Sequence, residues 1–175
     1  MSVPTLPMTV TTERLTLTLW SADDVAAIRA GGHRPGWHPD YPRRADRDAA
    51  GLWVDGDPWG PRHIVRGVTA LGSVGFFGPP DEAVDGVLET EVGYGLVEQA
   101  RGWGFATEAL TALLVATDAG AVRVRASVEP TNKPSIRVLA TCRFTQLRGS
   151  DEDGNLIMVR PLPPPVGHRG ADLDG

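Results

Sequence analysis

Alternating hydrophobic and polar residues predict most of the strands in this chain. In the segment 13–20, Leu15, Leu17 and Leu19 alternate with mostly polar neighbours, and the segment 122–129 shows the same period. A period of two places alternate side chains on opposite faces of a sheet, which is the pattern of a half-buried strand. Apolar runs predict further strands at 63–68, 72–77, 87–97, 144–148 and 156–160.

Helices are predicted where apolar residues recur at helical spacing behind a capping residue. Ser21 precedes Asp24 by three positions, a variant of the capping box that opens a short helix through Arg29. Asn132 suits the N-cap of a later helix, and Pro134 is tolerated in the first turn of that helix. Between these lie a short helix at 45–52 and a longer one at 106–117, which places on one face Ala106, Leu110, Leu113, Leu114 and Thr117.

The order of these elements is strand, helices, three strands, helix, strand, helix and two strands. It predicts an α+β fold with a mixed, mostly antiparallel central sheet of about seven strands, flanked by about four helices. The helix near 105–119 connects two strands that we expect to be parallel. We expect a single domain over residues 1–162 and a disordered tail over 163–175.

Composition narrows the classes of protein that suit this fold. The 175 residues carry 17 Lys and Arg against 22 Asp and Glu, a formal net charge of −5. A negative surface repels nucleic acid, so we expect no such partner; the charge either favours a cationic substrate or serves solubility alone. No stretch approaches the roughly 18 apolar residues of a membrane span, so no membrane partner is expected.

Cysteine usage and the N-terminal residues bear on location. Cys142 is the only cysteine, which excludes an intramolecular disulfide. The N-terminus has neither the basic nor the apolar segment of a signal peptide. We therefore expect a protein of the reducing cytoplasm, as a monomer or a homodimer.

The segment 97–107 runs from a predicted strand through a glycine-containing turn into a predicted helix. The first N–H groups of such a helix are unpaired, and the positive end of the helix dipole lies behind them. Gly102 and Gly104 let the backbone approach an anion closely, because neither carries a Cβ. The turn therefore predicts a pyrophosphate site. Thr107 stands where a dinucleotide-binding fingerprint needs its third glycine, and the Gly-Lys-Ser/Thr of a Walker loop is absent.

What this turn does contain is a pattern of Gln99, Gly102, Gly104 and Ala106, which resembles the acyl-CoA pyrophosphate loop of the GNAT superfamily of N-acetyltransferases. Three other segments match that superfamily in the same order, so that the resemblance spans residues 12–161. Residues 91–96 resemble the strand before the loop, and 132–135 resemble a second CoA-contacting motif. Residues 12–17 with 22–24 resemble the opening of the RimJ/RimL-like branch.

The resemblance implies a GNAT-like sheet, acetyl-CoA as acyl donor and no metal. It implies that main-chain groups of Leu96 and Val97 pair with the pantetheine arm, that the backbone from Arg101 to Thr107 holds the pyrophosphate, and that Asn132 bonds the pantetheine. The residues assigned to the cofactor are Leu96, Val97, Gln99, Arg101, Gly102, Trp103, Gly104, Phe105, Ala106, Thr107 and Asn132.

The histidines show no metal-ligand pattern. His33 and His38 lie five positions apart in a predicted loop, and His63 and His168 stand alone. Each of them is expected to be solvated.

Acetyl transfer to an amine requires a proton acceptor for the amine and a proton donor for the departing thiolate. Glu91 is the first candidate for the base, because it lies beside the predicted loop and partial burial would raise its pKa toward neutrality. Glu89, on the same strand face, is the second candidate and could act through water. Both could instead pair only with Arg123 or Arg125.

The proton donor departs from a common pattern of the superfamily. Many members carry a tyrosine seven residues after the motif asparagine, where this chain has Leu139. In the RimL-like branch the motif serine is the proposed donor, so Ser135 is the candidate; the alternative is a serine that caps its own helix. Arg143 also stands before Phe144 where a glycine is usual, which bears on the geometry of that turn.

The irregular segment 31–60 resembles the acceptor-side loop of the superfamily. Its aromatic and acidic residues would form a wall suited to a cation, although two or three tryptophans, Trp53 in particular, could simply pack in the core. The residues assigned to the acceptor are Trp37, His38, Asp40, Tyr41, Trp59 and, from the strand before the loop, Tyr94.

Three functions are compatible with the sequence. The branch resemblance implies acetylation of a protein N-terminal α-amine. A small-molecule acceptor, such as an aminoglycoside-like antibiotic or a polyamine, is the alternative, with antibiotic resistance as its outcome. A non-catalytic acyl-CoA-binding sensor domain is the third, supported by the missing tyrosine alone.

Overall fold

The computed structural model describes residues 2–164, so His168 and the predicted tail from residue 165 onward lie outside it. Within these residues the chain forms four α-helices, one 3₁₀ helix and nine strands. The helical elements are α1 (Ala22–Arg29), α2 (Arg44–Ala50), η1 (Glu98–Ala100), α3 (Phe105–Ala119) and α4 (Lys133–Thr141). The strands are β1 (Thr9–Thr11), β2 (Thr16–Leu19), β3 (Pro61–Arg66), β4 (Thr69–Phe76), β5 (Asp81–Glu82), β6 (Leu88–Leu96), β7 (Val122–Val128), β8 (Gln146–Ser150) and β9 (Leu156–Arg160).

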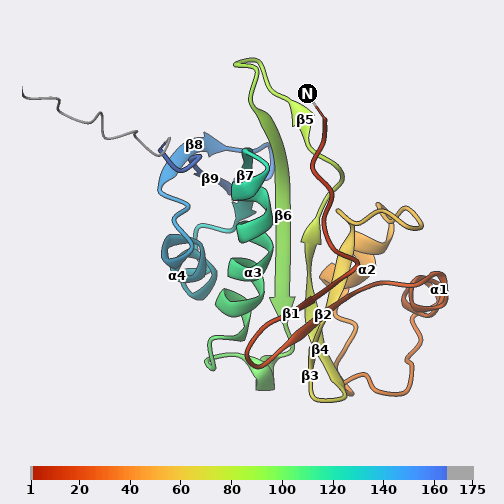
Figure 1. Cartoon of the computed structure of the whole chain (residues 1–175). Helices are drawn as coiled ribbons and strands as arrows, with labels where there is room; N and C mark the ends of the chain where they lie inside the picture. Colours follow the sequence, from red (N-terminus) through yellow and green to blue (C-terminus); the bar gives the residue numbers. More distant parts are fainter. Residues whose placement is uncertain (1, 165–175) are drawn as a thin grey trace, which may run out of the picture.

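The strands form one mixed sheet (Figure 1). Its order is β1-β2-β3-β4-β6-β7-β9-β8, and β5 pairs with the first residues of β6. Only β6 and β7 run parallel, and α3 connects them, which confirms the predicted class and the parallel step. The described sheet has nine strands rather than about seven, because β1 and β5, of three and two residues, are too short to show a hydrophobic period.

Helices cover both faces of the sheet. Along β6, Tyr94 reaches Ser135 of α4, whereas the adjacent Gly95 faces Arg43 beside α2. Neighbouring residues of a strand point to opposite faces, so α3 and α4 lie on one face and α2 on the other. Figure 1 shows these helices on either side of β6.

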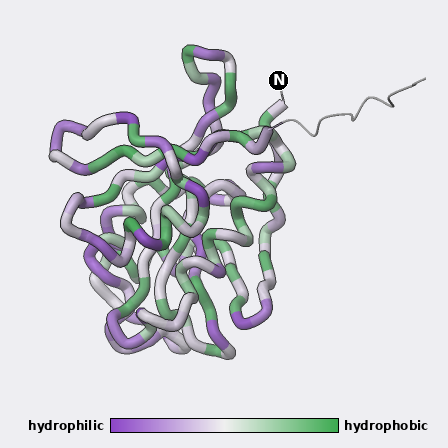
Figure 2. The backbone as a smooth tube through the Cα atoms, turned by 90° about the vertical axis from the view of Figure 1, so that its left-hand side faces the viewer, coloured by the Kyte–Doolittle hydropathy of each residue, from purple (hydrophilic) through white to green (hydrophobic). Residues whose placement is uncertain are grey.

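Hydrophobic side chains fill the layer between α3 and the sheet. Leu110, Leu113 and Leu114 of α3 are buried, as are Val122 and Val124 of β7. In Figure 2, hydrophilic residues gather in the outer turns of the chain. The helix face predicted from the apolar spacing of 106–117 is therefore the buried face.

Helix α4 ends in a Schellman turn whose left-handed residue is Arg143. The N–H of Phe144 donates to the C=O of Leu139 at 2.9 Å, and the N–H of Arg143 donates to the C=O of Ala140 at 3.0 Å. Arg143 has a φ of 67°, a conformation that favours glycine. The turn thus keeps the geometry that a glycine serves, and Arg143 bears the strain.

Candidate active site

The sheet opens between β6 and β7. The two strands pair only where residues 88–91 face residues 122–125. Beyond this point β6 continues along β4, while the rest of β7 pairs with β9 on its other side. The second half of β6 therefore presents an edge that does not pair with β7.

Main-chain groups of Tyr94 and Leu96 face this opening. The N–H of Val97 donates to the C=O of Leu71 on the β4 side at 2.9 Å, and the C=O of Val97 accepts from the N–H of Ala100 at 3.0 Å. Main-chain groups alternate in direction along a strand, so those of Tyr94 and Leu96 point away from β4. Both main-chain groups of Val97 already have partners within the protein, so the structure brings no free main-chain group of Val97 to this edge, and its pairing with the pantetheine arm stays a prediction.

The turn before α3 presents N–H groups that lack a side-chain cap. Gly102 and Gly104 both have a φ of 83°, and Gly104 is the N-cap of α3. A Cβ on Gly102 would meet nothing within 4 Å, so this position uses the conformational freedom of glycine rather than its small size. Unpaired N–H groups at the positive end of a helix dipole form an anion site.

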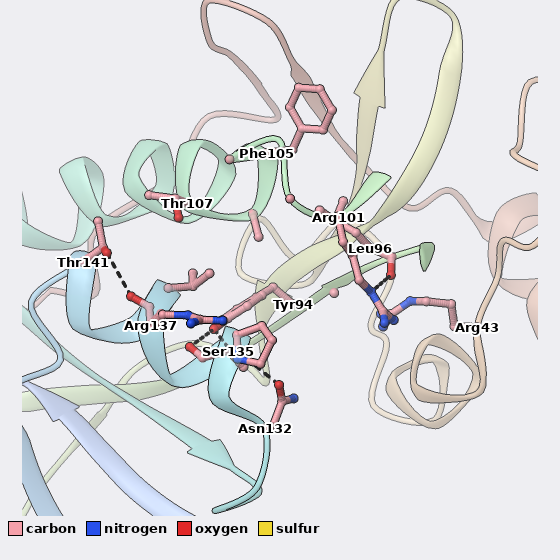
Figure 3. Close-up of a pocket in the computed structure, with 16 residues that line it drawn as sticks. Arg43, Tyr94, Leu96, Arg101, Phe105, Thr107, Asn132, Ser135, Arg137 and Thr141 are labelled. Carbon is pink, nitrogen blue, oxygen red and sulfur yellow. Dashed lines mark hydrogen bonds between the residues drawn. The ribbon is translucent and has the colours of Figure 1, made fainter. Parts of the chain in front are cut away.

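A cavity of about 480 Å³ connects this turn, the free edge of β6 and one face of α4 (Figure 3). Arg101 lines it from the turn, Arg137 from α4 and Arg43 from the position before α2, so three cations line the cavity. Arg101 also donates through Nε to the C=O of Leu96 at 3.1 Å. The cavity therefore combines positive charge at one end with an open strand edge along its side.

Most residues predicted for the cofactor line this cavity. They are Leu96, Arg101, Gly102, Gly104, Phe105, Ala106, Thr107 and Asn132. Gln99 and Trp103 instead line a separate cavity with His38 and Arg66, and 65% of Trp103 is exposed. The structure therefore does not bring these two residues to the cofactor cavity.

Other lining residues were missed by the sequence analysis. On α4 they are Pro134, Arg137, Val138 and Thr141, whose spacing puts them on one helix face and could have revealed them. Arg43 belongs to the irregular segment, where no signal singled it out, and it lies against Gly95.

Tyr94 and Ser135 bring two hydroxyl groups together at this cavity. The Oη of Tyr94 lies 2.8 Å from the Oγ of Ser135 and donates to the C=O of Ser135 at 3.2 Å. Burial raises the pKa of Tyr94 to about 12, although the hydrogen bond with Ser135 opposes this rise. Asn132 caps α4 by accepting the N–H of Ser135 at 3.2 Å, so the helix does not need the Ser135 hydroxyl as its cap. The partner of that hydroxyl is Tyr94.

Glu89 and Glu91 pair with arginines on the face of β6 opposite Tyr94. Arg123, Arg125 and Arg148 donate to Glu89 at 2.6 to 2.8 Å. The hydrogen bonds from Arg148, more than offsetting burial, lower the pKa of Glu89 to about 2. Glu89 is therefore a poor proton acceptor, contrary to expectation. Glu91 accepts from Arg125 Nε at 3.1 Å and lines neither cavity around Tyr94.

The predicted aromatic wall is buried. Trp37, Tyr41 and Trp59 expose 8%, 1% and 2% of their surface, because large aromatic side chains contribute most to stability inside a core. His38 lines the outer cavity beside Trp103, and Asp40 is exposed. The prediction that these residues form one wall for a cation is therefore wrong.

His63 is also buried, contrary to the expectation of a solvated ring. Its Nε2 lies 2.9 Å from Asp24, and its Nδ1 lies 2.7 Å from the Oη of Tyr41. Trp37 packs against the same ring. This polar group ties α1 and the loop that follows it to β3.

A second cavity, of about 170 Å³, lies on the α2 side of the sheet. Arg43 and Tyr94 line both cavities, so the two meet at these residues. Asp46 and Asp57 line the second cavity together with Arg43, which pairs with Asp46, so the charged side chains of its lining carry one net negative charge. Gly93 also lines it, and Phe77 packs over Gly93. The structure thus supplies two adjoining compartments on either side of β6.

Fold and site together define an acyl-CoA-dependent transferase, with an anion-binding helix end, an open strand edge and an adjoining compartment. Residues 14–145 match the family model described as "Acetyltransferase (GNAT) domain". The chain belongs to the GNAT acetyltransferase family, which confirms the prediction of an acetyl-CoA-dependent N-acetyltransferase.

Solved structures of acetyltransferases share the fold. Mycobacterium smegmatis RimJ, solved with CoA-disulfide, is 23% identical with a TM-score of 0.60, over 90% of this chain and 89% of that chain. RimL, a ribosomal L7/L12 alpha-N-protein acetyltransferase solved with CoA, is 17% identical with a TM-score of 0.61, over 88% and 98%. MccE, a microcin C7 self-immunity acetyltransferase solved with acetyl-CoA and AMP, is 18% identical with a TM-score of 0.60, over 92% and 100%.

The likeness of these neighbours to the chain is one of fold. Comparison with curated protein sequences finds no significant match. Across residues 2–164, no group of three or more His, Cys, Asp or Glu side chains is arranged to hold a metal ion. None of the helices in that part of the chain is long and apolar enough to cross a membrane.

Proposed function

We propose that the larger cavity binds acetyl-CoA and that its acetyl group passes directly to a primary amine held in the smaller cavity. One observation carries this proposal: the uncapped N-terminus of α3 and the free edge of β6 open into the same cavity. An extended donor can place its pyrophosphate on the first and its amide-containing arm along the second. Arg101 and Arg137 would then contact phosphate oxygens.

In the transfer, the amine nitrogen attacks the thioester carbonyl carbon and the C=O electron pair moves onto oxygen. The intermediate then breaks its C–S bond, and the thiolate departs with the bonding electrons. The nitrogen loses one proton and the thiolate gains one. Tyr94 is positioned to donate that proton, because it lines both cavities and its hydroxyl is bonded to Ser135.

Glu91 is the proposed proton acceptor, acting through water. It lies on the same strand face as Gly93, about 7 Å along β6 from that residue. Glu91→Gln is expected to lower turnover about 10- to 1,000-fold at neutral pH, with recovery at high pH, where the amine is already neutral. Equal rates for both proteins across the pH range would remove Glu91 from this role.

The proposed acceptor is a protein N-terminal α-amine, supported by the likeness to RimJ and RimL. A small cationic amine is the second candidate, because the smaller cavity holds only about 170 Å³ and carries Asp46 and Asp57. The likeness to the self-immunity enzyme MccE also favours a small molecule. We place this reaction in the cytoplasm, where acetyl-CoA is made, and the active species is a monomer or a homodimer.

Release of free thiol from acetyl-CoA tests the proposal. The purified full chain is incubated with N-terminal peptides, polyamines and aminoglycosides in separate reactions. Amine-dependent thiol release confirms a transferase, and the amine that gives the highest kcat/KM identifies the acceptor class. Tight CoA binding without release in any reaction would instead identify a non-catalytic sensor.

A further inference from the structure

Arg43 occupies the junction between the two cavities. It is the only cationic residue, among those the structure describes, that lines both of them. Its guanidinium lies against Gly95 of β6: a Cβ on Gly95 would stand 2.1 Å from Nη1 and 2.5 Å from Cζ. The missing side chain of Gly95 therefore makes the room that the guanidinium occupies.

A buried carboxylate fixes this guanidinium. Arg43 donates to Asp46 through Nε at 3.1 Å and through Nη2 at 3.0 Å, and Asp46 is 1% exposed. Ser73 also donates to Asp46 and is the cross-strand partner of Gly95. Within residues 2–164, Nη1 makes no hydrogen bond, and Arg43 lines both cavities, so this N–H group has no partner that holds it away from a ligand.

We propose that Arg43 is a catalytic residue, whose Nη1 stabilises the negative charge that develops on the thioester oxygen during acetyl transfer. This inference rests on the proposed function. The amine comes from one compartment and the acyl group from the other, so this charge forms where they meet. A donor fixed before the reaction and partly shielded from water stabilises such a charge strongly. Asp46 and Ser73 are the positioning residues.

The charges around the smaller cavity separate this role from recognition of an acceptor carboxylate. Asp46 and Asp57 both line that compartment, and Asp57 accepts the N–H of Trp59 at 2.9 Å. Because Arg43 already pairs with Asp46, the net negative charge there is that of Asp57, which would repel an acceptor carboxylate. The free N–H of Arg43 is therefore matched to a transient negative charge rather than to a permanent one on the acceptor.

The test compares Arg43→Met with Arg44→Met in the full chain. Arg44 is exposed and adjacent, and it lines neither cavity, which makes it a matched control. Arg43→Met is expected to lower kcat about 100- to 1,000-fold while the acceptor KM and the calorimetric CoA affinity stay near wild type. Its melting temperature should fall, because the buried Asp46 loses its cationic partner, so kcat is measured well below that temperature. Arg43→Lys should keep part of the wild-type kcat, and Arg44→Met should keep all of it.

Gly95→Ala supplies an independent arm, because its methyl group would displace the guanidinium while leaving Arg43 in the chain. It is expected to reproduce the loss of kcat with CoA affinity retained. An Arg43→Met protein with wild-type kcat and a raised acceptor KM overturns the proposal, as does one that loses only stability. A wild-type protein that binds CoA but acetylates no amine overturns the proposed function itself, a result visible before any variant is made.

Discussion

The phenolic oxygen of Tyr94 lies 2.8 Å from the hydroxyl oxygen of Ser135, which joins β6 to α4 beside the larger cavity. Leu139, seven residues after Asn132, is fully buried in the core and offers no hydroxyl. The hydroxyl groups at this part of the larger cavity come instead from β6 and from the start of α4. The two hydroxyl groups form one unit through which a proton can reach the departing thiolate.

Tyr94→Phe and Ser135→Ala are each expected to lower kcat about 10- to 100-fold with little change in CoA affinity. The kcat of the double variant should be hardly lower than that of either single variant, because the effects of mutating two residues that act as one unit do not add. Steady-state kinetics and calorimetry on all three proteins measure this. Ser135→Ala should also keep its melting temperature, since Asn132 provides the side-chain cap of α4. A lowered melting temperature with a normal kcat would assign Ser135 to the helix alone.

Gly102 and Gly154 form a matched pair for testing the anion site. Both have a φ of 83°, and a Cβ on either would meet nothing within 4 Å. Gly102→Glu and Gly154→Glu should therefore lose similar stability from the same backbone strain. Only Gly102→Glu is expected to weaken CoA binding, by roughly 2 kcal/mol or more, because it puts a carboxylate where phosphate would lie. Equal calorimetric affinities for the two variants would place the pyrophosphate elsewhere.

Glu89 is expected to make the stability of the folded protein depend on pH in the acidic range. Its pKa falls from 4.5 to about 2 in the folded state, mainly through Arg148, so its charged form favours folding. That contribution is complete above pH 4.5 and is lost as the pH falls toward 2. Wild type should melt above Glu89→Gln at neutral pH, and the difference should shrink below pH 4.5. Glu152→Gln, at an exposed position in the turn between β8 and β9, is the control and should match wild type throughout.

Arg143→Gly is expected to stabilise the protein by about 1 kcal/mol. Arg143 holds a φ of 67° at the end of α4, a conformation that costs a residue with a Cβ about 1–2 kcal/mol, while the added freedom of glycine in the unfolded chain offsets part of the gain. Arg143→Ala keeps the Cβ and should show no comparable gain. Urea unfolding of the three proteins decides, and a glycine variant no more stable than the alanine variant would show that the turn is not strained.

The parts of the fold that local sequence determines were predictable. The alternation in 122–129 gave β7, and the caps Ser21 and Asn132 fixed the starts of α1 and α4, because each signal acts within a few residues. Most residues predicted for the cofactor line the larger cavity for the same reason, since the glycine turn and the helix start are contiguous in the chain.

The remainder depends on contacts between distant segments. Val97 is engaged because of the register of β6 on β4, which no local pattern reveals. Tyr41 and His63 are bonded to each other in the core although they lie 22 residues apart. Arg43 reaches Gly95 only after the loop has docked on the sheet, so its place at the junction was not foreseeable from its neighbours in sequence.

The most direct test of the account is the acetylation of an amine with acetyl-CoA labelled in its acetyl group. The full chain is incubated with the best acceptor from the amine panel, and the product is identified by mass spectrometry while free thiol is counted. The account predicts one labelled acetyl group on the amine nitrogen for each thiol released, with both strongly reduced at limiting acetyl-CoA in Gly102→Glu and retained in Gly154→Glu. Thiol release without an acetylated amine, or CoA binding without either, would contradict it.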